Sequence, residues 1–222
     1  ETSSLDAHQA ELVGISLSSI IGKACYIPIG HKSKGCLKKE IVIKKLKPIL
    51  EDKSVKKIGQ NIKFDFIVLY KQGIQMSSME DTMLMSYVLD AGKNRHNMDT
   101  LSEIHLNHKT ISFKDLVGTG KKEINFSDVE LDRAMEYAAE DADITYRLYK
   151  IFNKNLKLEK LANVYEIFEK PLIEILAFME INGIKIDSKF LKDLSLKFEK
   201  KIKNLEKEIF KLSKKEFNIG SP

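Results

Sequence analysis

Several features that define protein classes are scarce in this sequence of 222 residues. Its two cysteines, Cys25 and Cys36, form no CxxC pair, which excludes a disulfide framework and a zinc finger as organising features. No run of 18 apolar residues occurs, so no membrane-spanning helix is expected. The first ten residues are polar and do not resemble a signal peptide. We therefore expect a protein of a reducing compartment, the cytoplasm, with no membrane partner.

The composition is that of a globular protein with a sizeable core, since 43% of the residues are hydrophobic and 31% are charged. The 37 basic and 32 acidic residues give a net charge of +5. Residues 188–216 alone contain 10 Lys and 5 acidic residues, so the basic surplus lies in this segment. Clustered lysines can follow a phosphate backbone, and they are equally expected on the solvated face of a helix.

The pattern of the first hundred residues is that of an α/β domain. Alternating apolar and polar residues predict three strands, over 11–18, 23–29 and 55–59. Amphipathic patterns predict four helices, over 38–51, 62–72, 80–90 and 98–107. Strands followed by strand–helix alternation indicate a mixed β-sheet flanked by helices.

The most regular helical pattern covers residues 127–154. Ser127 and Glu130 fit a capping box in which Ser127 is the N-cap. Apolar residues then recur every three or four positions from Leu131 to Phe152, which predicts a buried helix face.

A second helical pattern follows after residue 157. An apolar-rich helix is expected over 163–180, with an interruption at Pro171. Asp187 is expected to cap a final helix, in which apolar residues from Leu191 to Leu212 form a seam for a partner helix.

The sequence has no initiator methionine and stops without a terminal element, so we expect a fragment of a longer protein. We divide it into one domain over 1–157 and an incomplete helical piece over 158–222. Because the apolar seam of that piece would lack part of its partner, we expect disorder or self-association of the helix in this fragment.

Three short clusters contain residues suited to chemistry: Glu1–Asp6 before a strand, Gly59–Asp65 at a strand-to-helix junction, and Tyr137–Asp143 inside the longest helix. Tyr137 and Asp141 are four residues apart and therefore share one helix face. A carboxylate on a largely apolar face needs a partner. That partner is either the Tyr137 hydroxyl alone or a metal ion and a water.

The three clusters taken together point to a metal site more strongly than any one of them does. Asp65 lies at the start of its helix, where acidic residues are also common because they favour the helix dipole. Acids at a strand end, a helix start and a helix interior can converge on a sheet edge, and carboxylate oxygens suit Mg²⁺ or Mn²⁺. Two such ions, roughly 3.5–4 Å apart, stabilise the attacking and leaving oxygens in phosphodiester hydrolysis.

The order Glu-Thr-x-Ser-Leu-Asp, Gln-Asn-x-Lys-Phe-Asp and Tyr-Ala-Ala-Glu-Asp-Ala-Asp resembles the three exonuclease motifs of the family A DNA polymerases, the family of bacterial DNA polymerase I. The likeness includes Asp81–Leu84 and Asn182–Asp187 and covers essentially the whole chain. It implies a ribonuclease H-like exonuclease fold, followed by a helical segment from the start of the polymerase thumb. The implied activity is 3′–5′ proofreading, which hydrolyses phosphodiester bonds at DNA 3′ ends and releases 5′-mononucleotides.

The resemblance also implies roles for particular residues. Glu1, Asp65 and Asp141 are similar to carboxylates that bind two Mg²⁺ ions, with Mn²⁺ or Zn²⁺ as substitutes, and Tyr137 is similar to the tyrosine that positions the attacking water. A further set resembles side chains that contact the 3′-terminal nucleotides of a single strand. Its members that resemble side chains stacking on or wedging between the last bases are Leu5, Phe64 and Phe113, and those that resemble further contacts are Gln60, Asn61, Arg95 and Met98. The four apolar members of this set can alternatively belong to the core. The five histidines show no ligand spacing and receive no role.

One departure from the family pattern lies in the first motif, which reads Asp-x-Glu. The glutamate matches Glu1, and the aspartate would stand two positions earlier, outside this sequence. Three hypotheses therefore stay open: an active exonuclease domain, an inactive module of the same shape that supports the polymerase or binds single-stranded DNA, and a stand-alone exoribonuclease. Residues 163–187 favour the first two, because they resemble the start of a polymerase domain.

The resemblance finally implies partners and a cellular setting. They are a single-stranded DNA 3′ end and the rest of the polymerase, in a monomeric bacterial protein associated with the nucleoid. Polymerase activity is not expected from this chain, because only 35 residues (222 − 187) follow residue 187, too few for the palm and fingers.

Overall fold

A β-hairpin and a pair of parallel strands make up the β-structure of the computed structural model, which describes residues 1–220. Strand β1 (Gly14–Ile20) pairs antiparallel with β2 (Lys23–Pro28), and β3 (Lys57–Gly59) pairs parallel with β4 (Met79–Asp81). The expected mixture of pairing directions is confirmed, in two separate two-stranded sheets. The helix expected near 80–90 begins at Thr82, because Met79, Glu80 and Asp81 form the buried strand β4, which the sequence pattern did not predict.

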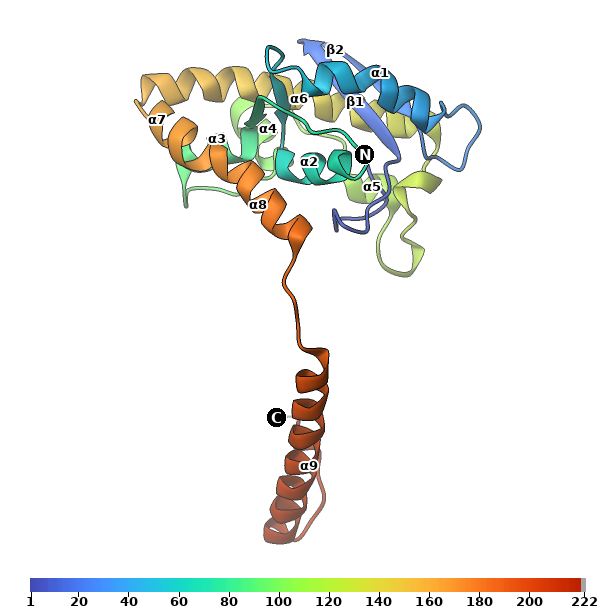
Figure 1. Cartoon of the computed structure of the whole chain (residues 1–222), viewed down its shortest axis with the longest axis vertical. Coiled ribbons are helices and arrows are strands. Elements are labelled where there is room, and N and C mark those ends of the chain that lie inside the picture. The colour runs from blue at the N-terminus through green and yellow to red at the C-terminus, as the bar shows by residue number, and fades with distance from the viewer. Residues whose placement is uncertain (221–222) are drawn as a thin grey trace. The chain divides into compact units, whose positions relative to one another are not determined.

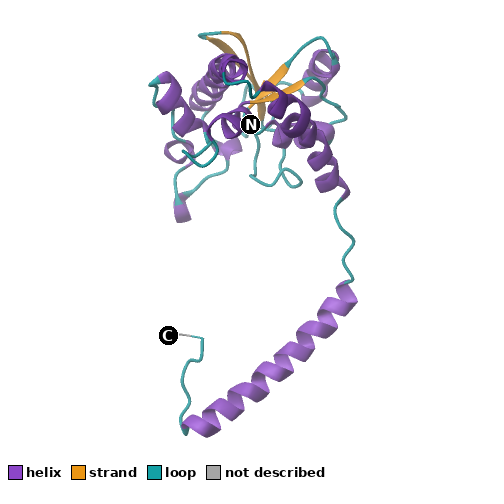
Figure 2. Ribbon diagram, turned by 90° about the vertical axis from the view of Figure 1, so that its left-hand side faces the viewer, coloured by secondary structure: helices purple, strands orange, loops and turns teal. Residues whose placement is uncertain are grey.

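Helices surround these strands (Figures 1 and 2). The expected helices are present as α1 (Lys39–Glu51), α2 (Ile62–Tyr70), α3 (Thr82–Asp90) and α4 (Met98–Leu106). The chain then forms the short helix α5 (Phe113–Val117) and the 3₁₀ turns η1 (Gly120–Lys122) and η2 (Phe126–Asp128), none of which the sequence pattern predicted.

The long helix α6 (Leu131–Leu158) packs against β1, β2, α3 and α4. Ala134 and Ala138 are fully buried on its inner face, so the first half of α6 approaches its neighbours closely. The predicted capping box was wrong. Ser127 lies inside η2 and donates its backbone N–H to the Asn125 side chain, and α6 begins only at Leu131. A local cap of this kind competes with helix initiation at the serine.

The first compact unit of the chain runs from Glu1 to Ile181. After α6 it contains α7 (Ala162–Val164), the π-helical turn η3 (Tyr165–Glu169) and α8 (Lys170–Asn182). The predicted interruption appears as this π-helical turn just before Pro171, which sits in the first turn of α8, where a missing backbone N–H costs little. Ile173 and Ala177 of α8 are buried in the same apolar cluster as Phe66 and Ile67 of α2. Residues 158–181 therefore pack with the preceding ones, and the division into domains at residue 157 stays a prediction.

The second unit begins at Asn182 and contains α9 (Ser188–Ser213). Asp187 is its N-cap, as predicted, and accepts the backbone N–H of Phe190 at 2.9 Å. None of the helices within residues 1–220 is long and apolar enough to cross a lipid bilayer.

Candidate active site

Glu1 lies beside the start of β1. Its carbonyl oxygen accepts the backbone N–H groups of Val13 (2.9 Å) and Gly14 (3.2 Å). A Cβ atom on Gly14 would lie 2.1 Å from the Tyr26 hydroxyl oxygen, so a glycine is needed here for the tyrosine ring to fit. Tyr26 in turn contacts His31, with 2.7 Å between the hydroxyl oxygen and Nε2. Burial chiefly, and then the charge of Glu1, raise the pKa of Tyr26.

Asp65 lies in the first turn of α2. Its side chain is accessible to solvent, yet the surrounding protein reduces its solvation and is the main reason that its pKa rises to about 7. The terminal ammonium of Glu1 lowers this pKa, whereas the carboxylates of Glu1 and Asp81 raise it. Asp65 and Glu1, which are 64 positions apart in sequence, are therefore close enough for the charges of Glu1 to change the pKa of Asp65.

Asp141 and Tyr137 lie on one face of α6, as their spacing predicted. Burial raises the pKa of Asp141 to about 8, the charge of Glu1 adds to this effect, and a hydrogen bond from the Tyr137 hydroxyl acts against it. Burial and the charges of Asp141 and Glu1 also raise the pKa of Tyr137. The fold thus brings Glu1, Asp65, Tyr137 and Asp141 into one electrostatically connected group.

The chemistry of this group suits a divalent cation. Burial is the main cause of the raised pKa values of both aspartates, and repulsion from the Glu1 carboxylate adds to it. A cation between them would relieve that repulsion, and carboxylate oxygens are the ligands that Mg²⁺ prefers. Within residues 1–220, however, no three His, Cys, Asp or Glu side chains are already arranged around a point where they could hold a metal ion.

Aromatic side chains surround the Tyr137 ring. The rings of Phe113 and Phe126 lie 5.9 and 6.1 Å from it, and these two phenylalanines stack on each other at 6.2 Å. Phe126 is buried, whereas Phe113 is 39% exposed. Phe113 therefore packs against Tyr137 and still offers part of its surface to a ligand.

The other residues that the resemblance singled out have different surroundings. Leu5 is 93% exposed, and Asn61 and Arg95 are also exposed. Phe64 packs at the edge of an apolar cluster, and Met98 packs on α6, where its sulfur accepts the Thr145 hydroxyl.

Gln60 is hydrogen-bonded at both ends of its amide. Its oxygen accepts the hydroxyl of Thr82, and its nitrogen donates to the carbonyl oxygen of His96 at 2.8 Å. These bonds hold the side chain in place at the junction of β3 and α2.

Two acidic residues near the site were assigned no role by sequence reasoning. Glu140 accepts hydrogen bonds from His108 and from the backbone N–H of Ile111, both at 2.7 Å, and so fixes the segment that leads to Phe113. No local pattern reveals this contact. Asp81 accepts the backbone N–H groups of Asn61 and Ile62, at the start of α2. Its position just before an apolar helix is a recognisable signal for the N-cap of α3. That signal does not reveal the contact of Asp81 with α2.

Comparison with known proteins identifies the family. Residues 1–157 match the family model described as 3′–5′ exonuclease. A DNA polymerase I of Rhizobium leguminosarum is 44% identical to the chain, in an alignment that includes all of the chain and 24% of that protein. The chain spans about a quarter of the length of the curated relatives it matches.

Solved structures show the same fold. The POL domain of Pol1 from M. smegmatis, in a complex with DNA primer-template and dNTP, superimposes with a TM-score of 0.73 at 19% identity, over 96% of this chain and 33% of that one. Brucella melitensis NrnC with bound Mg²⁺ superimposes with a TM-score of 0.62 at 22% identity, over 85% of this chain and 87% of that one. These likenesses confirm the expected exonuclease fold. Because the family model accounts for most of the sequence, the chain belongs to the 3′–5′ exonuclease family of DNA polymerase I.

Proposed function

We propose that this chain contains the proofreading exonuclease of a bacterial DNA polymerase I, which hydrolyses phosphodiester bonds at DNA 3′ ends and releases 5′-mononucleotides. One observation carries the proposal. Asp65 and Asp141 lie on different helices, and both have raised pKa values. The negative charge of Glu1 contributes to the rise in each case. Carboxylates with strongly perturbed pKa values are typical of catalytic sites.

Glu1, Asp65 and Asp141 would hold two Mg²⁺ ions, which Mn²⁺ or Zn²⁺ could replace. When bound, the ions supply positive charge that stabilises the attacking and leaving oxygens of the phosphodiester. The chain itself orients the water. Tyr137 is held on one side by Phe113 and Phe126, and its hydroxyl lies beside Asp141, where it can position a water against the phosphorus.

Leu5, Phe64 and the exposed part of Phe113 would contact the bases of the terminal nucleotides, and Met98 would make a further contact to these nucleotides. Such apolar contacts accept any base, as proofreading requires. Asn61 and Arg95 would reach the sugar and phosphates, and Gln60 would support that surface. The partners would be a single-stranded DNA 3′ end and the rest of a monomeric polymerase at the bacterial nucleoid, in replication and repair.

A second candidate function is an exonuclease-shaped module that supports the polymerase or binds single-stranded DNA without cutting it. It is favoured by the observation that, in the part of the chain that the structure describes, no three potential ligands are arranged around a metal position.

The test is cleavage of 5′-labelled single-stranded DNA in Mg²⁺, with EDTA as a control. It compares the unchanged chain with Asp141→Asn and Tyr137→Phe. Asp132→Asn is the matched control, because Asp132 is exposed on the same helix. We expect shortening from the 3′ end, a loss of more than ~100-fold for Asp141→Asn, and a loss of ~10- to 100-fold for Tyr137→Phe, the range for a residue that supports a metal ligand.

The same assay is run on the chain extended at its N-terminus by two residues, Asp-Ser, because the first motif of the family reads Asp-x-Glu. Cleavage by either form supports the exonuclease proposal if it is lost in Asp141→Asn and kept in Asp132→Asn. If neither form cuts DNA but both bind it, the non-catalytic module is the correct function.

A further inference from the structure

Asp81, the last residue of β4, is an almost fully buried carboxylate, with 2% of its surface exposed. It accepts four backbone N–H groups. Oδ1 accepts those of Met83 (2.8 Å), Asn61 (3.1 Å) and Leu84 (3.3 Å), and Oδ2 accepts that of Ile62 (2.9 Å). The carboxylate therefore caps its own helix, α3, and also binds the start of α2, some 20 positions earlier in the sequence.

The start of α2 depends on this contact. Asn61 is the N-cap residue of α2, but its side chain makes no capping hydrogen bond. Its backbone has φ 60°, a left-handed conformation that costs energy for a residue other than glycine and persists where its surroundings impose it. Asp81 supplies the missing cap from another element, because it binds the N–H groups of Asn61 and Ile62 together.

Asp81 is itself held from the other side. Its backbone N–H donates to the Tyr165 hydroxyl oxygen at 2.9 Å, and that hydroxyl donates to Glu80 at 3.1 Å. Tyr165 is 1% exposed. The end of β4 is thus a fixed point between the η3 turn and the turn that begins α2.

We propose that Asp81 is a positioning residue of the exonuclease site, acting through the start of α2. By fixing where α2 begins, it sets the place of Asp65, one turn further along, and of Gln60 and Asn61 at the junction. Asp81 touches neither substrate nor metal in this role. The inference rests on the proposed exonuclease function.

The experiment separates this role from the capping of α3. Serine is as good an N-cap as aspartate, so Asp81→Ser keeps the cap on α3, but its single short oxygen cannot also reach Asn61 and Ile62. Asp187→Ser is the matched control, because Asp187 caps α9 in the second unit. For each protein, kcat and KM for single-stranded DNA and the hydrogen exchange of the Asn61 and Ile62 amides are measured. Thermal unfolding confirms that each variant is folded.

We expect Asp81→Ser to lower kcat by at least ~10-fold, with KM changed less than about twofold, and to speed exchange at both amides about tenfold or more. Asp187→Ser should change none of these. Unchanged exchange at Asn61 and Ile62, or a kcat equal to that of the control, overturns the proposal. If Asp81→Ser does not fold, Asp81→Asn takes its place. The amide nitrogen of the asparagine is a donor and cannot accept the Ile62 N–H, so the hydrogen bond to α2 at that position is lost.

The exchange measurement keeps the two hypotheses distinguishable. If the unchanged chain and its extended form do not cut DNA, the exonuclease proposal fails on its own. The placement of α2 by Asp81 is then decided by exchange alone: faster exchange in Asp81→Ser supports it, and unchanged exchange overturns it.

Discussion

At the scale of single residues, the site is defined by charges that the protein holds close together. Asp141 keeps its proton to about pH 8 in the folded chain, whereas an ordinary aspartate loses it near 3.8. Burial disfavours the ionised form, and Glu1 adds like-charge repulsion. Ionisation of Asp141 without a cation therefore costs folding free energy.

This cost predicts a pH dependence of stability. Between pH 4 and 8 the folded state binds more protons at Asp141 than the unfolded state does, so this residue's contribution to stability decreases as the pH rises. In EDTA, we expect the melting temperature of the unchanged chain to fall relative to that of Asp141→Asn as the pH goes from 4 to 8. Thermal denaturation across this range measures the difference.

Asp132→Asn serves as the control and should leave the pH profile unchanged, because Asp132 is exposed. Added Mg²⁺ should raise the melting temperature of the unchanged chain more at pH 8 than at pH 5, since it binds the ionised carboxylates. A difference between the unchanged chain and Asp141→Asn that stays constant from pH 4 to 8 would contradict the raised pKa.

The sequence predicted that Tyr137 and Asp141 share a face, because four positions in a helix fix that geometry. It could not predict the link between Asp81 and the start of α2. That link requires β3 and β4 to pair. Only three residues of each strand take part in the pairing, which is too short a segment for its register to be predicted from the sequence.

At the scale of elements, the boundaries of α1 and α2 followed from the sequence, whereas the start of α6 did not. The apolar periodicity of a long helix is visible locally, but its first residue depends on which polar side chain captures the nearby N–H groups. Here Asn125 does so before Ser127 can act as a cap. Strand β4 was missed because buried Glu80 and Asp81 resemble a helix start and receive their partners from distant elements.

Buried Glu80 is contacted by three side chains that are distant in the sequence. This buried carboxylate accepts Lys56 at 3.1 Å, Lys170 at 2.8 Å and the Tyr165 hydroxyl at 3.1 Å. The contacts join β4 to the η3 turn and α8. They explain why residues 158–181 pack with the preceding part of the chain, past the end of the family match at residue 157.

Tyr165→Phe tests this junction. The substitution removes one hydroxyl and leaves the Asp81 N–H without its partner and Glu80 with one donor fewer. We expect the free energy of unfolding to fall by about 1–3 kcal/mol, the cost of an unsatisfied buried polar group. Urea denaturation measures it. Tyr87→Phe is the matched control, because Tyr87 is 51% exposed, and an equal loss in both variants would argue against the junction.

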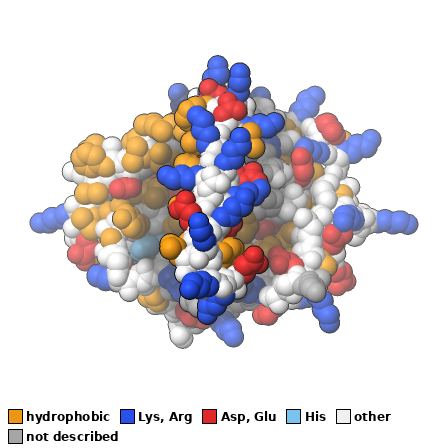
Figure 3. Space-filling view, turned by 90° about the horizontal axis from the view of Figure 1, so that it is seen from below, with side chains coloured by type: hydrophobic (Ala, Val, Ile, Leu, Met, Phe, Trp, Pro, Cys, Tyr) orange, Lys and Arg blue, Asp and Glu red, His pale blue; other side chains and the backbone are white. Residues whose placement is uncertain are grey.

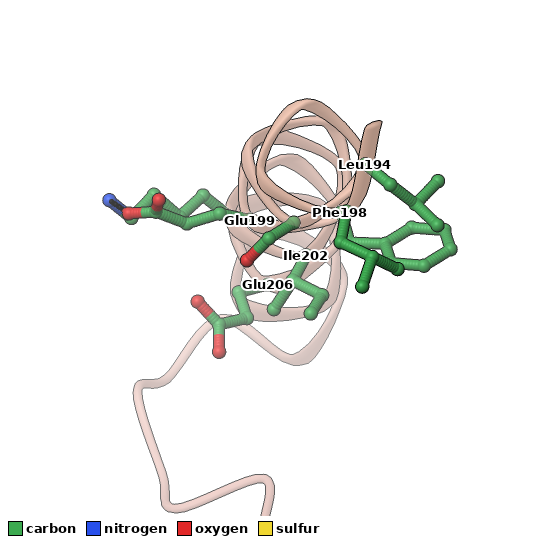
Figure 4. A pocket seen from close by; sticks show the side chains of 8 residues that line it. Leu194, Phe198, Glu199, Ile202 and Glu206 are labelled. Atoms are coloured by element: carbon green, nitrogen blue, oxygen red, sulfur yellow. Dashed lines mark hydrogen bonds and ion pairs between the residues drawn. The ribbon is translucent and has the colours of Figure 1, made fainter. Parts of the chain in front are cut away.

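At the scale of the whole molecule, charge and apolar surface are distributed differently. Basic and acidic side chains are interspersed over the face that Figure 3 shows. On α9, by contrast, apolar side chains form a continuous row, and Leu191, Phe198, Ile202 and Leu205 are each 47–55% exposed. Figure 4 shows Leu194, Phe198 and Ile202 on this row, with Glu199 and Glu206 beside it. An amphipathic helix of this length buries such a row wherever a partner is available.

We expect a second copy of the chain to cover this row, in a reversible self-association through α9 at micromolar concentrations. Phe198→Gln together with Ile202→Gln should give a monomer, because the two changes remove the middle of the row while the helix keeps its cap at Asp187. Lys197→Gln with Lys201→Gln is the matched control and should still associate, since it leaves the row intact. Sedimentation velocity separates these outcomes. A chain that stays monomeric at every concentration, with α9 resistant to protease, would show that the row is already covered within a single molecule.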